Sequence, residues 1–123
     1  MGKLVIAVPT KRHDGLEDVV SEVFGKAKTF TIVDVEDGKV KGVRVVDNPA
    51  ATYQYGAGPI VVKTLLDLKT NLVVTAELGP GASGLLEQHS IRTVLVRPNT
   101  KVADSIAEAL SKPKAKPSSE GQI

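Results

Sequence analysis

The sequence predicts an α/β domain in which a mixed five-stranded sheet carries helices on both faces. Short apolar runs rich in Val, Ile and Leu recur along the chain and are typical of buried strands. An Asp37-Gly38 turn lies between two β-branched runs, which indicates a β-hairpin. After the hairpin, helical and strand patterns alternate, and this order requires parallel strands joined by right-handed crossovers.

The first predicted strand is Leu4–Val8, a continuous apolar run that Pro9 ends. An uninterrupted apolar run of this kind is typical of a central strand that is buried on both faces. The next apolar segment, Val19–Phe24, is short and is broken by Gly25. It therefore predicts either one helical turn or an irregular segment.

The predicted hairpin consists of Thr29–Val35 and Val40–Val46. Both runs are rich in β-branched residues, which favour strands. The alternation of the second run is imperfect, so we expect one of its faces to be partly exposed. Asn48-Pro49 ends the hairpin, because this dipeptide favours the start of a turn.

The second half of the chain alternates helix and strand. A helix is predicted from Pro59 to about Lys69, with Pro59 at the first helical position, where its missing N–H is not needed. The other predicted elements are a strand over 72–76, a second short helix through Leu85, Leu86 and Gln88, a strand over 91–96, and a third helix that Asn99 or Thr100 caps and that turns Val102, Ile106, Ala109 and Leu110 inward.

A chain of 123 residues fits one domain. We predict a folded domain over residues 1–110 and a disordered tail over residues 111–123, which is rich in Lys, Pro and Ser. The tail has three lysines and one glutamate, so it carries the net charge of +2, and the remaining 13 basic and 13 acidic residues balance. The pI near 8.9 therefore reflects the tail, and we expect no nucleic-acid partner.

The chain has no cysteine, which excludes a disulfide or a thiolate metal site within it. This composition suits a reducing compartment, and we expect a cytoplasmic protein. No apolar run approaches the roughly 20 residues that a membrane span needs, so we expect no membrane association.

Two glycine-rich segments each precede a predicted helix, and both are interpreted as loops. They are Gly56-Ala57-Gly58 and Gly79-Pro80-Gly81, the latter running on to Gly84. Glycine allows close backbone approach, and a helix start offers unpaired N–H groups and a positive partial charge, so both segments favour an anion. The alternative is a glycine turn that merely leads into a helix. Tyr53 and Tyr55 flank the first segment and could cover a ligand, contact a partner or pack on the core edge.

Residues that carry out catalysis are not evident in the sequence. His13 lies in a polar loop and is expected to be solvated, and His89 lies near the end of the second helix, where it suits the helix dipole. Two histidines alone do not form a metal site. Four acidic residues close in sequence are expected to form a solvated face; these are Asp14, Glu17, Asp18 and Glu22.

The sequence also argues against an enzyme. It has no G-x-S-x-G motif, no cysteine nucleophile and no H-E-x-x-H motif. A nuclease that uses two metals needs carboxylates on the central strands, and Leu4–Val8 has none. We therefore expect a protein that binds rather than catalyses.

Short motifs follow one another in a fixed order over residues 3–110. They are Val5–Thr10, Ser21–Ala27, Phe30–Asp34, Asn48-Pro49-Ala50, Gly56-Ala57-Gly58 and Gly79-Pro80-Gly81-Ala82, with Ile91 after them. This ordered set resembles the dinitrogenase iron–molybdenum cofactor-binding family. The family often has histidine at the positions that Val23 and Tyr55 occupy here.

The resemblance implies a ribonuclease-H-like three-layer fold without nuclease chemistry. It implies transient binding or carriage of an iron–molybdenum or related iron–sulfur type cluster, with cofactor-assembly proteins as partners. The implied site comprises Tyr55, Gly56, Ala57 and Gly58, with Ser21, Glu22, Gly79 and Gly81 as neighbours and with Lys11, Arg12 and Lys26 as cations for an anionic cluster. The alternative is a module that binds a small anionic metabolite or a protein partner.

Overall fold

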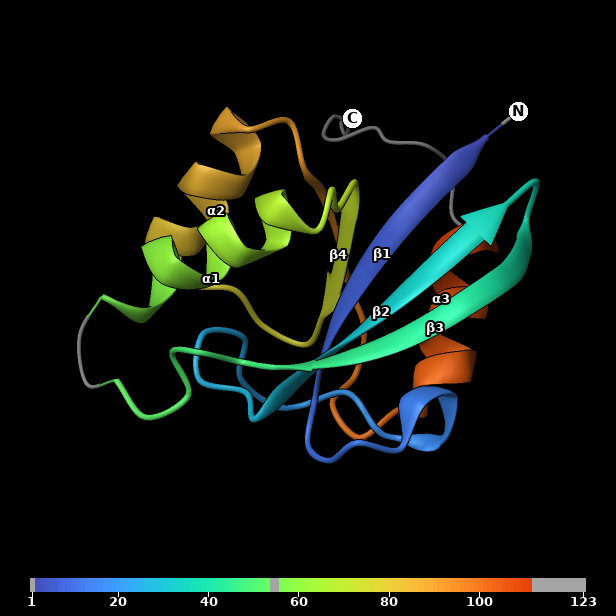
Figure 1. Ribbon diagram of the computed structural model, residues 1–123, viewed down its shortest axis with the longest axis horizontal. Coiled ribbons are helices and arrows are strands. Elements are labelled where there is room, and N and C mark those ends of the chain that lie inside the picture. Colours follow the sequence, from blue (N-terminus) through green and yellow to red (C-terminus); the bar gives the residue numbers. More distant parts are fainter. Residues whose placement is uncertain (1, 54–55, 112–123) are drawn as a thin grey trace.

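The computed structural model describes residues 2–53 and 56–111. Its centre is a five-stranded sheet in the order β3-β2-β1-β4-β5 (Figure 1). β1 pairs antiparallel with β2 and parallel with β4, so the sheet is mixed. The strands are β1 Lys3–Thr10, β2 Thr29–Glu36, β3 Lys39–Asp47, β4 Leu72–Thr75 and β5 Arg92–Leu95.

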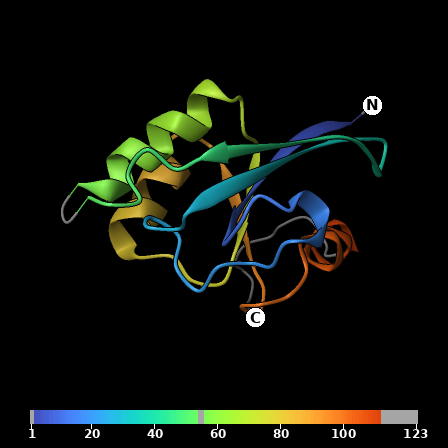
Figure 2. The same cartoon turned by 60° about the horizontal axis from the view of Figure 1, so that its bottom comes forward.

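Helices cover both faces of the sheet. α1 (Ala57–Asp67) and α2 (Pro80–Gln88) pack on one face, whereas α3 (Val102–Ser111) packs on the other (Figures 1 and 2). A short 3-10 helix, η1 (Gly15–Glu17), lies beside α3. The expected α/β class, with a mixed five-stranded sheet and helices on both faces, is confirmed. Within the described residues, no helix is long and apolar enough to cross a lipid bilayer.

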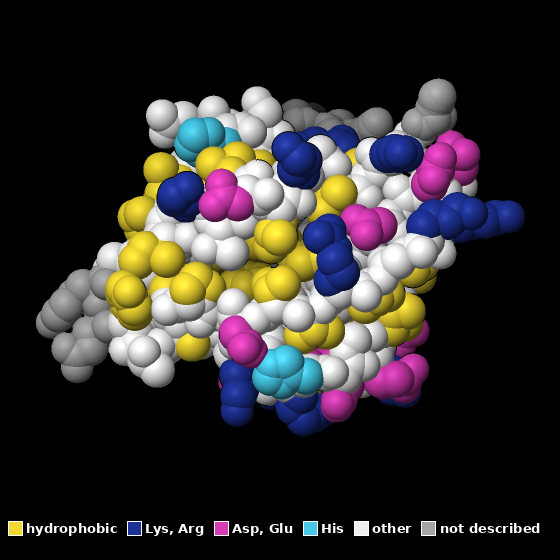
Figure 3. Space-filling model, viewed as in Figure 1, with side chains coloured by type: hydrophobic (Ala, Val, Ile, Leu, Met, Phe, Trp, Pro, Cys, Tyr) yellow, Lys and Arg dark blue, Asp and Glu magenta, His cyan; other side chains and the backbone are white. Residues whose placement is uncertain are grey.

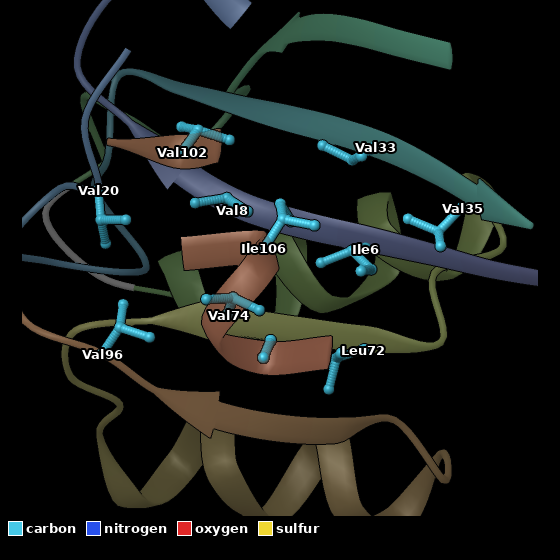
Figure 4. Close-up of a cluster of buried hydrophobic side chains, with 11 residues drawn as sticks. Ile6, Val8, Val20, Val33, Val35, Leu72, Val74, Val96, Val102 and Ile106 are labelled. Carbon is cyan, nitrogen blue, oxygen red and sulfur yellow. The ribbon is translucent and has the colours of Figure 1, made fainter. Parts of the chain in front are cut away.

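Alternate residues of β1 supply two separate cores. Ile6 and Val8 point toward α3, whose Val102 and Ile106 pack against them (Figure 4). Ala7 points to the opposite face and joins the cluster under α1 and α2. A strand buried on both faces has no polar side of its own, which is why its sequence is continuously apolar.

The core under α1 and α2 holds both phenylalanines of the chain. The rings of Phe24 and Phe30 meet edge to face, with centroids 5.6 Å apart. Val61, Val62 and Leu65 of α1 are buried against them in the same cluster. The helical spacing of these α1 residues places them on one side of the helix, so the helix lies flat on the sheet.

The predicted hairpin is confirmed, with a turn at Asp37 and Gly38, whose φ values are 53° and 82°. β3 is an edge strand, and its pairing with β2 contains a β-bulge next to Asp34 and Val35. Lys39 and Lys41 are exposed along this edge. Charged side chains and bulges of this kind discourage a second chain from pairing with the edge.

Several helix starts differ from the sequence-based expectation. α1 begins at Ala57, so Pro59 is its third residue rather than its first. α2 begins at Pro80, so Gly81 and Gly84 lie inside the helix and not in a loop. Proline is tolerated throughout the first turn because the first N–H groups of a helix have no intrahelical partner.

The expected cap of α3 is wrong. The helix begins at Val102, two residues after Thr100, and the Thr100 Oγ1 donates to the carbonyl of Arg97 instead. Asn99 has a φ of 66° and belongs to the preceding turn. The α3 start is satisfied from elsewhere in the chain, because the Val102 N–H donates to the carbonyl of Asp18 at 2.9 Å.

Candidate functional site

Three loops meet beyond the carboxyl ends of β1 and β4, and we name their meeting place the three-loop junction. It comprises residues 21–27 after β1, residues 48–53 and 56–58 before and into α1, and residues 76–82 after β4. A Cβ built on Gly25 would lie 3.6 Å from the Ala57 Cβ, and one built on Gly58 would lie 4.0 Å from the Ala82 Cβ. The starts of α1 and α2 are therefore in close contact.

The sheet topology makes this position a natural binding place. The chain leaves β1 toward β2 on one side and leaves β4 toward β5 on the other side. In open α/β sheets, ligands bind in the crevice outside the carboxyl ends of strands at such a switch point.

The two helices begin without side-chain caps. Gly56 precedes α1 and Gly79 precedes α2, and neither helix has a side-chain cap bond or an acidic residue in its first turn within the described chain. The first N–H groups of a helix lack intrahelical partners and carry a positive partial charge. The first turns of α1 and α2 approach each other at Gly58 and Ala82, and helix starts of this kind favour an anion.

The backbone conformation at position 56 favours glycine. Its φ of 76° lies in the left-handed region, which L-residues adopt only with strain. Gly79 has a φ of −70° and ψ of 161°, which any residue can adopt. Gly56 and Gly79 are the last residues before their helices, so Ala57 and Gly58 lie in the first turn of α1 and not in the loop that the sequence predicts before Pro59.

Asn48 fixes the loop after β1 against the loop before α1. Its Nδ2 donates to the carbonyls of Gly25 and Ala27 at 2.9 and 2.8 Å, and its Oδ1 accepts from the Ala50 N–H at 2.9 Å. The side chain is nearly buried. The side-chain amide thus uses both its N–H groups and its oxygen. Asn48 therefore determines the position of both loops.

Glu77 connects the loop after β4 to the other two loops of the junction. Its Oε1 accepts from the Phe24 N–H at 3.2 Å and so links the loop after β4 to the loop after β1. Ser21 is also in the junction: its N–H donates to the Pro9 carbonyl, and its Oγ accepts from the Val23 N–H. Neither Glu77 nor Asn48 was among the site residues that the sequence predicts.

The junction also has apolar surface. Val23 and Tyr53 are each 45% exposed, although both are large hydrophobic side chains. Figure 3 shows hydrophobic side chains gathered on the left, where α1 begins, while charged side chains lie along the lower and right-hand borders and also across the upper part and middle of this face. The apolar surface and the helix starts therefore share one side of the molecule.

Of the other predicted site residues, some lie in the three-loop junction and some lie elsewhere. Glu22 and Lys26 are exposed within the loop after β1, and Gly81 is exposed at the second position of α2. Lys11 and Arg12 make their side-chain bonds elsewhere, to Asn99 before α3 and to Asp14 respectively. Tyr55 lies outside the described residues.

Asp18 corrects the expectation of a fully solvated acidic face. Its side chain is completely buried, and its carboxylate accepts four backbone N–H groups. The donors are Val19 at 2.8 Å, Arg12 at 2.9 Å, and Lys11 and Asp14 at 3.4 Å each. Asp18 therefore organises the loop that follows β1, and the other three acidic residues are exposed.

The histidines do not come together. His13 is exposed and its Nε2 lies 2.7 Å from Asp47 Oδ1, whereas His89 is the residue that ends α2, as predicted. In the described part of the chain, no three His, Cys, Asp or Glu residues are grouped so that they could hold a metal ion.

A separate hollow of about 290 Å³ lies over the other end of the sheet. Its lining mixes cations and anions, among them Lys3, Lys41, Asp34 and Glu36. Opposite charges in one open hollow give no preference for an anion, and the hollow shares no residue with the three-loop junction.

Comparison with known proteins decides the family. The sequence profile of the family described as dinitrogenase iron-molybdenum cofactor matches residues 2–112. The chain belongs to this family. The resemblance expected from the ordered motifs is confirmed, because the match extends over nearly all of the described residues.

Solved structures of other proteins share the fold of this chain. The apo form of the orange protein from Desulfovibrio gigas superimposes with a TM-score of 0.78 and 27% identity, covering 86% of this chain and 86% of that protein. The Thermotoga protein TM1290, described as a candidate NifB protein, gives a TM-score of 0.69 and 28% identity, covering 88% and 87%. These similarities indicate a small protein connected with cofactors.

A further relative is the uncharacterized protein MJ0580 of Methanocaldococcus jannaschii. It is 26% identical over 72 residues, which are 58% of this chain and 61% of MJ0580. The match thus spans less than two thirds of that protein.

Proposed function

We propose that this protein is a non-enzymatic binding or carrier protein for an iron–molybdenum or related metal–sulfur cofactor. The cofactor is its cargo during cofactor assembly, so assembly proteins are its partners. One observation carries the proposal: in a member of this family, two uncapped helix starts lie in contact at the carboxyl ends of β1 and β4. Cofactor carriage in the reducing cytoplasm suits oxygen-sensitive metal–sulfur chemistry.

The groups present fit an anionic cargo that is held without direct ligation. Backbone N–H groups of α1 and α2 donate to sulfide or oxide ligands on the cargo surface, and Lys26 adds a positive charge beside them. The exposed Val23 and Tyr53 cover the less polar parts of the cargo. Binding of this kind is reversible, as carriage requires. The ribonuclease-H-like class is part of the same proposal, and the mixed sheet with helices on both faces supports it.

Titration with tetrathiomolybdate, followed by NMR, tests the proposal. We expect the amide signals of residues 21–27, 56–60 and 79–83 to shift, and those of β3 to stay unchanged. The isolated iron–molybdenum cofactor is then added under the same anaerobic conditions. If the junction signals stay in place with both additions, the proposal is wrong.

A matched pair of variants at Gly81 sharpens this test. A Cβ at Gly81 meets nothing within 4 Å, and the residue is the second of α2. Gly81→Asp places a carboxylate at the helix start, where it suits the helix dipole but repels an anionic ligand. Gly81→Asn has the same shape without the charge. We expect Gly81→Asp to abolish the shifts and Gly81→Asn to retain them.

The second candidate is a module for a small anionic metabolite or a protein partner. The exposure of Val23 and Tyr53 next to the helix starts favours this candidate, because apolar groups around polar donors are typical of contact surfaces. A thermal-shift screen with phosphates and nucleotides separates the candidates. If these compounds stabilise the protein and tetrathiomolybdate does not bind, the result would favour a module for a small anionic metabolite.

A further inference from the structure

β5 forms the edge of the sheet opposite β3, and its backbone is open on one side. The N–H groups of Arg92 and Val96 donate toward β4. Because successive residues of a strand direct their backbone groups to opposite sides, the N–H and C=O groups of Thr93 and Leu95 point away from β4. In the described part of the chain, no backbone group pairs with them. β5 therefore presents a row of donors and acceptors to solvent.

The two edges of the sheet differ in their protection. β3 has exposed lysines at positions 39 and 41 and a bulge in its pairing with β2. β5 pairs with β4 in an unbroken register and contains neither lysine nor proline. It also carries Leu95, which is 56% exposed, more than any other large hydrophobic side chain of the described residues. Apart from its short length, β5 lacks the features that discourage pairing with a second chain.

We propose that two copies of this chain associate through β5, strand against strand and antiparallel. The inference does not depend on the proposed function. In the register centred on Val94, Thr93 of each copy lies opposite Leu95 of the other. The outward N–H groups of both residues in both copies then find carbonyl acceptors across the contact. The same surface serves both copies, as a twofold dimer requires.

The side chains of β5 suit a second copy on both faces of the sheet. Val94 packs against the core under α3, and in this register the two Val94 side chains meet across the axis. On the opposite face, each exposed Leu95 is covered by Thr93 of the other copy. The two Arg92 side chains lie at opposite ends of the contact, about 14 Å apart along the strands, and each is opposite the apolar Val96. Like charges therefore do not oppose each other.

The association ends at two copies and is weak. Pairing uses both β5 edges, so the joined sheet ends at β3 on either side, where the lysines and the bulge discourage a further chain. Because β5 has only four residues, the contact buries less than the roughly 1,200 Å² of a stable interface. We therefore expect a dissociation constant on the order of 100 μM.

Sedimentation velocity of the full-length protein tests the association at concentrations from about 10 μM to about 1 mM, which bracket this dissociation constant. We expect the apparent mass to rise from the 13.0 kDa of one chain toward twice that value. A mixture of isotope-labelled and unlabelled protein then locates the contact by NMR. We expect filtered nuclear Overhauser signals between Val94 of the two copies and between Thr93 and Leu95.

A matched pair of variants separates β5 from the rest of the surface. Leu95→Lys replaces the apolar side chain at the contact by a charge, so we expect self-association to weaken about tenfold or more. Val40→Lys changes the net charge equally on β3, where Val40 is 41% exposed. We expect its dissociation constant to stay within a factor of about two of the unmodified protein. Circular dichroism checks that both exposed substitutions leave the fold intact.

A protein that keeps an apparent mass of 13.0 kDa at the highest concentration overturns the proposal and leaves the β5 edge to a strand of another protein. A dimer that Leu95→Lys leaves intact, or that both variants weaken equally, overturns it as well. Contacts from β5 to β3 of the other copy would show head-to-tail pairing and also contradict it. The supporting result is a dimer that Leu95→Lys alone weakens, with Val94 in contact across the two copies.

Discussion

At the scale of single residues, the most constrained side chain is the Asp18 carboxylate. Backbone N–H groups in a tight loop must find acceptors when they leave water, and here one buried carboxylate serves four of them. The same residue also accepts the first N–H of α3 through its backbone carbonyl. Asp18 therefore joins the loop after β1 to the start of the last helix.

We predict that Asp18→Asn lowers the free energy of unfolding by about 1–3 kcal/mol, because the new amide group faces N–H donors that then lack an acceptor. Urea denaturation monitored by circular dichroism measures the change. Asp14→Asn is the control: its exposed carboxylate pairs with the exposed Arg12, and we expect a change below about 0.5 kcal/mol. Similar losses in the two variants would contradict this account.

Gly56 and Gly79 form a natural pair for testing backbone strain, since each directly precedes a helix and a Cβ at either would meet nothing within 4 Å. We predict that Gly56→Ala is destabilised by about 1–2 kcal/mol, because an L-residue is strained at φ 76°. Gly79→Ala should differ from the unmodified protein by less than about 0.5 kcal/mol, since its φ is −70°. Thermal unfolding of both proteins provides the comparison, and equal stabilities would refute it.

At the scale of elements, the three-loop junction depends on long-range side-chain anchors. We predict that Asn48→Ala lowers the free energy of unfolding by about 2–4 kcal/mol, because three partners, two of them in buried hydrogen bonds, lose their bonds together. Hydrogen exchange should accelerate in residues 24–27 and 50–53, while α3 keeps its protection. Uniform acceleration over the whole chain would mean that Asn48 is not a local anchor.

Local patterns were sufficient for most of the elements. The hairpin was predictable because Asp37 and Gly38 are residues that tolerate the positive φ of its turn. The start of α2 was not predictable, because Gly81 and Gly84 each disfavour a helix by about 1 kcal/mol. Burial of Leu86 and the contact of Ala82 with α1 outweigh that local preference, and neither contact is visible in the sequence.

For the candidate site, the sequence predicted the glycines at the helix starts but not the side chains that hold the loops together. The glycines before α1 and α2 indicated two helix starts, but their mutual contact depends on how the helices cross the sheet. The roles of Asp18, Asn48 and Glu77 were missed because a side chain's partners far along the chain leave no local signal. Charged side chains are normally exposed, so the sequence gives no reason to expect a buried Asp18. Its burial is possible because hydrogen-bond donors surround the carboxylate.

At the scale of the whole molecule, β1 links two cores that no helix shares. We predict that Leu65→Ala, under α1, and Ile106→Ala, under α3, each lower the free energy of unfolding by about 2–5 kcal/mol. Each variant should still unfold in a single transition, seen equally by circular dichroism and by methyl NMR signals of both faces. Leu95→Ala is the control, because Leu95 is 56% exposed, and we expect a change below about 0.5 kcal/mol. Different unfolding midpoints for the two faces of the sheet would show that the two cores do not unfold together.

The bulge and the lysines along the β3 edge have a consequence for the synthesis of the protein. The β2–β3 hairpin is complete before α1 leaves the ribosome, so newly synthesised chains on neighbouring ribosomes expose this edge to one another while the rest of the sheet is missing. We expect the bulge beside Asp34 and the lysines at positions 39 and 41 to discourage pairing between nascent chains during that interval. The edge thus limits association between nascent chains at a stage when the three-loop junction has not yet formed.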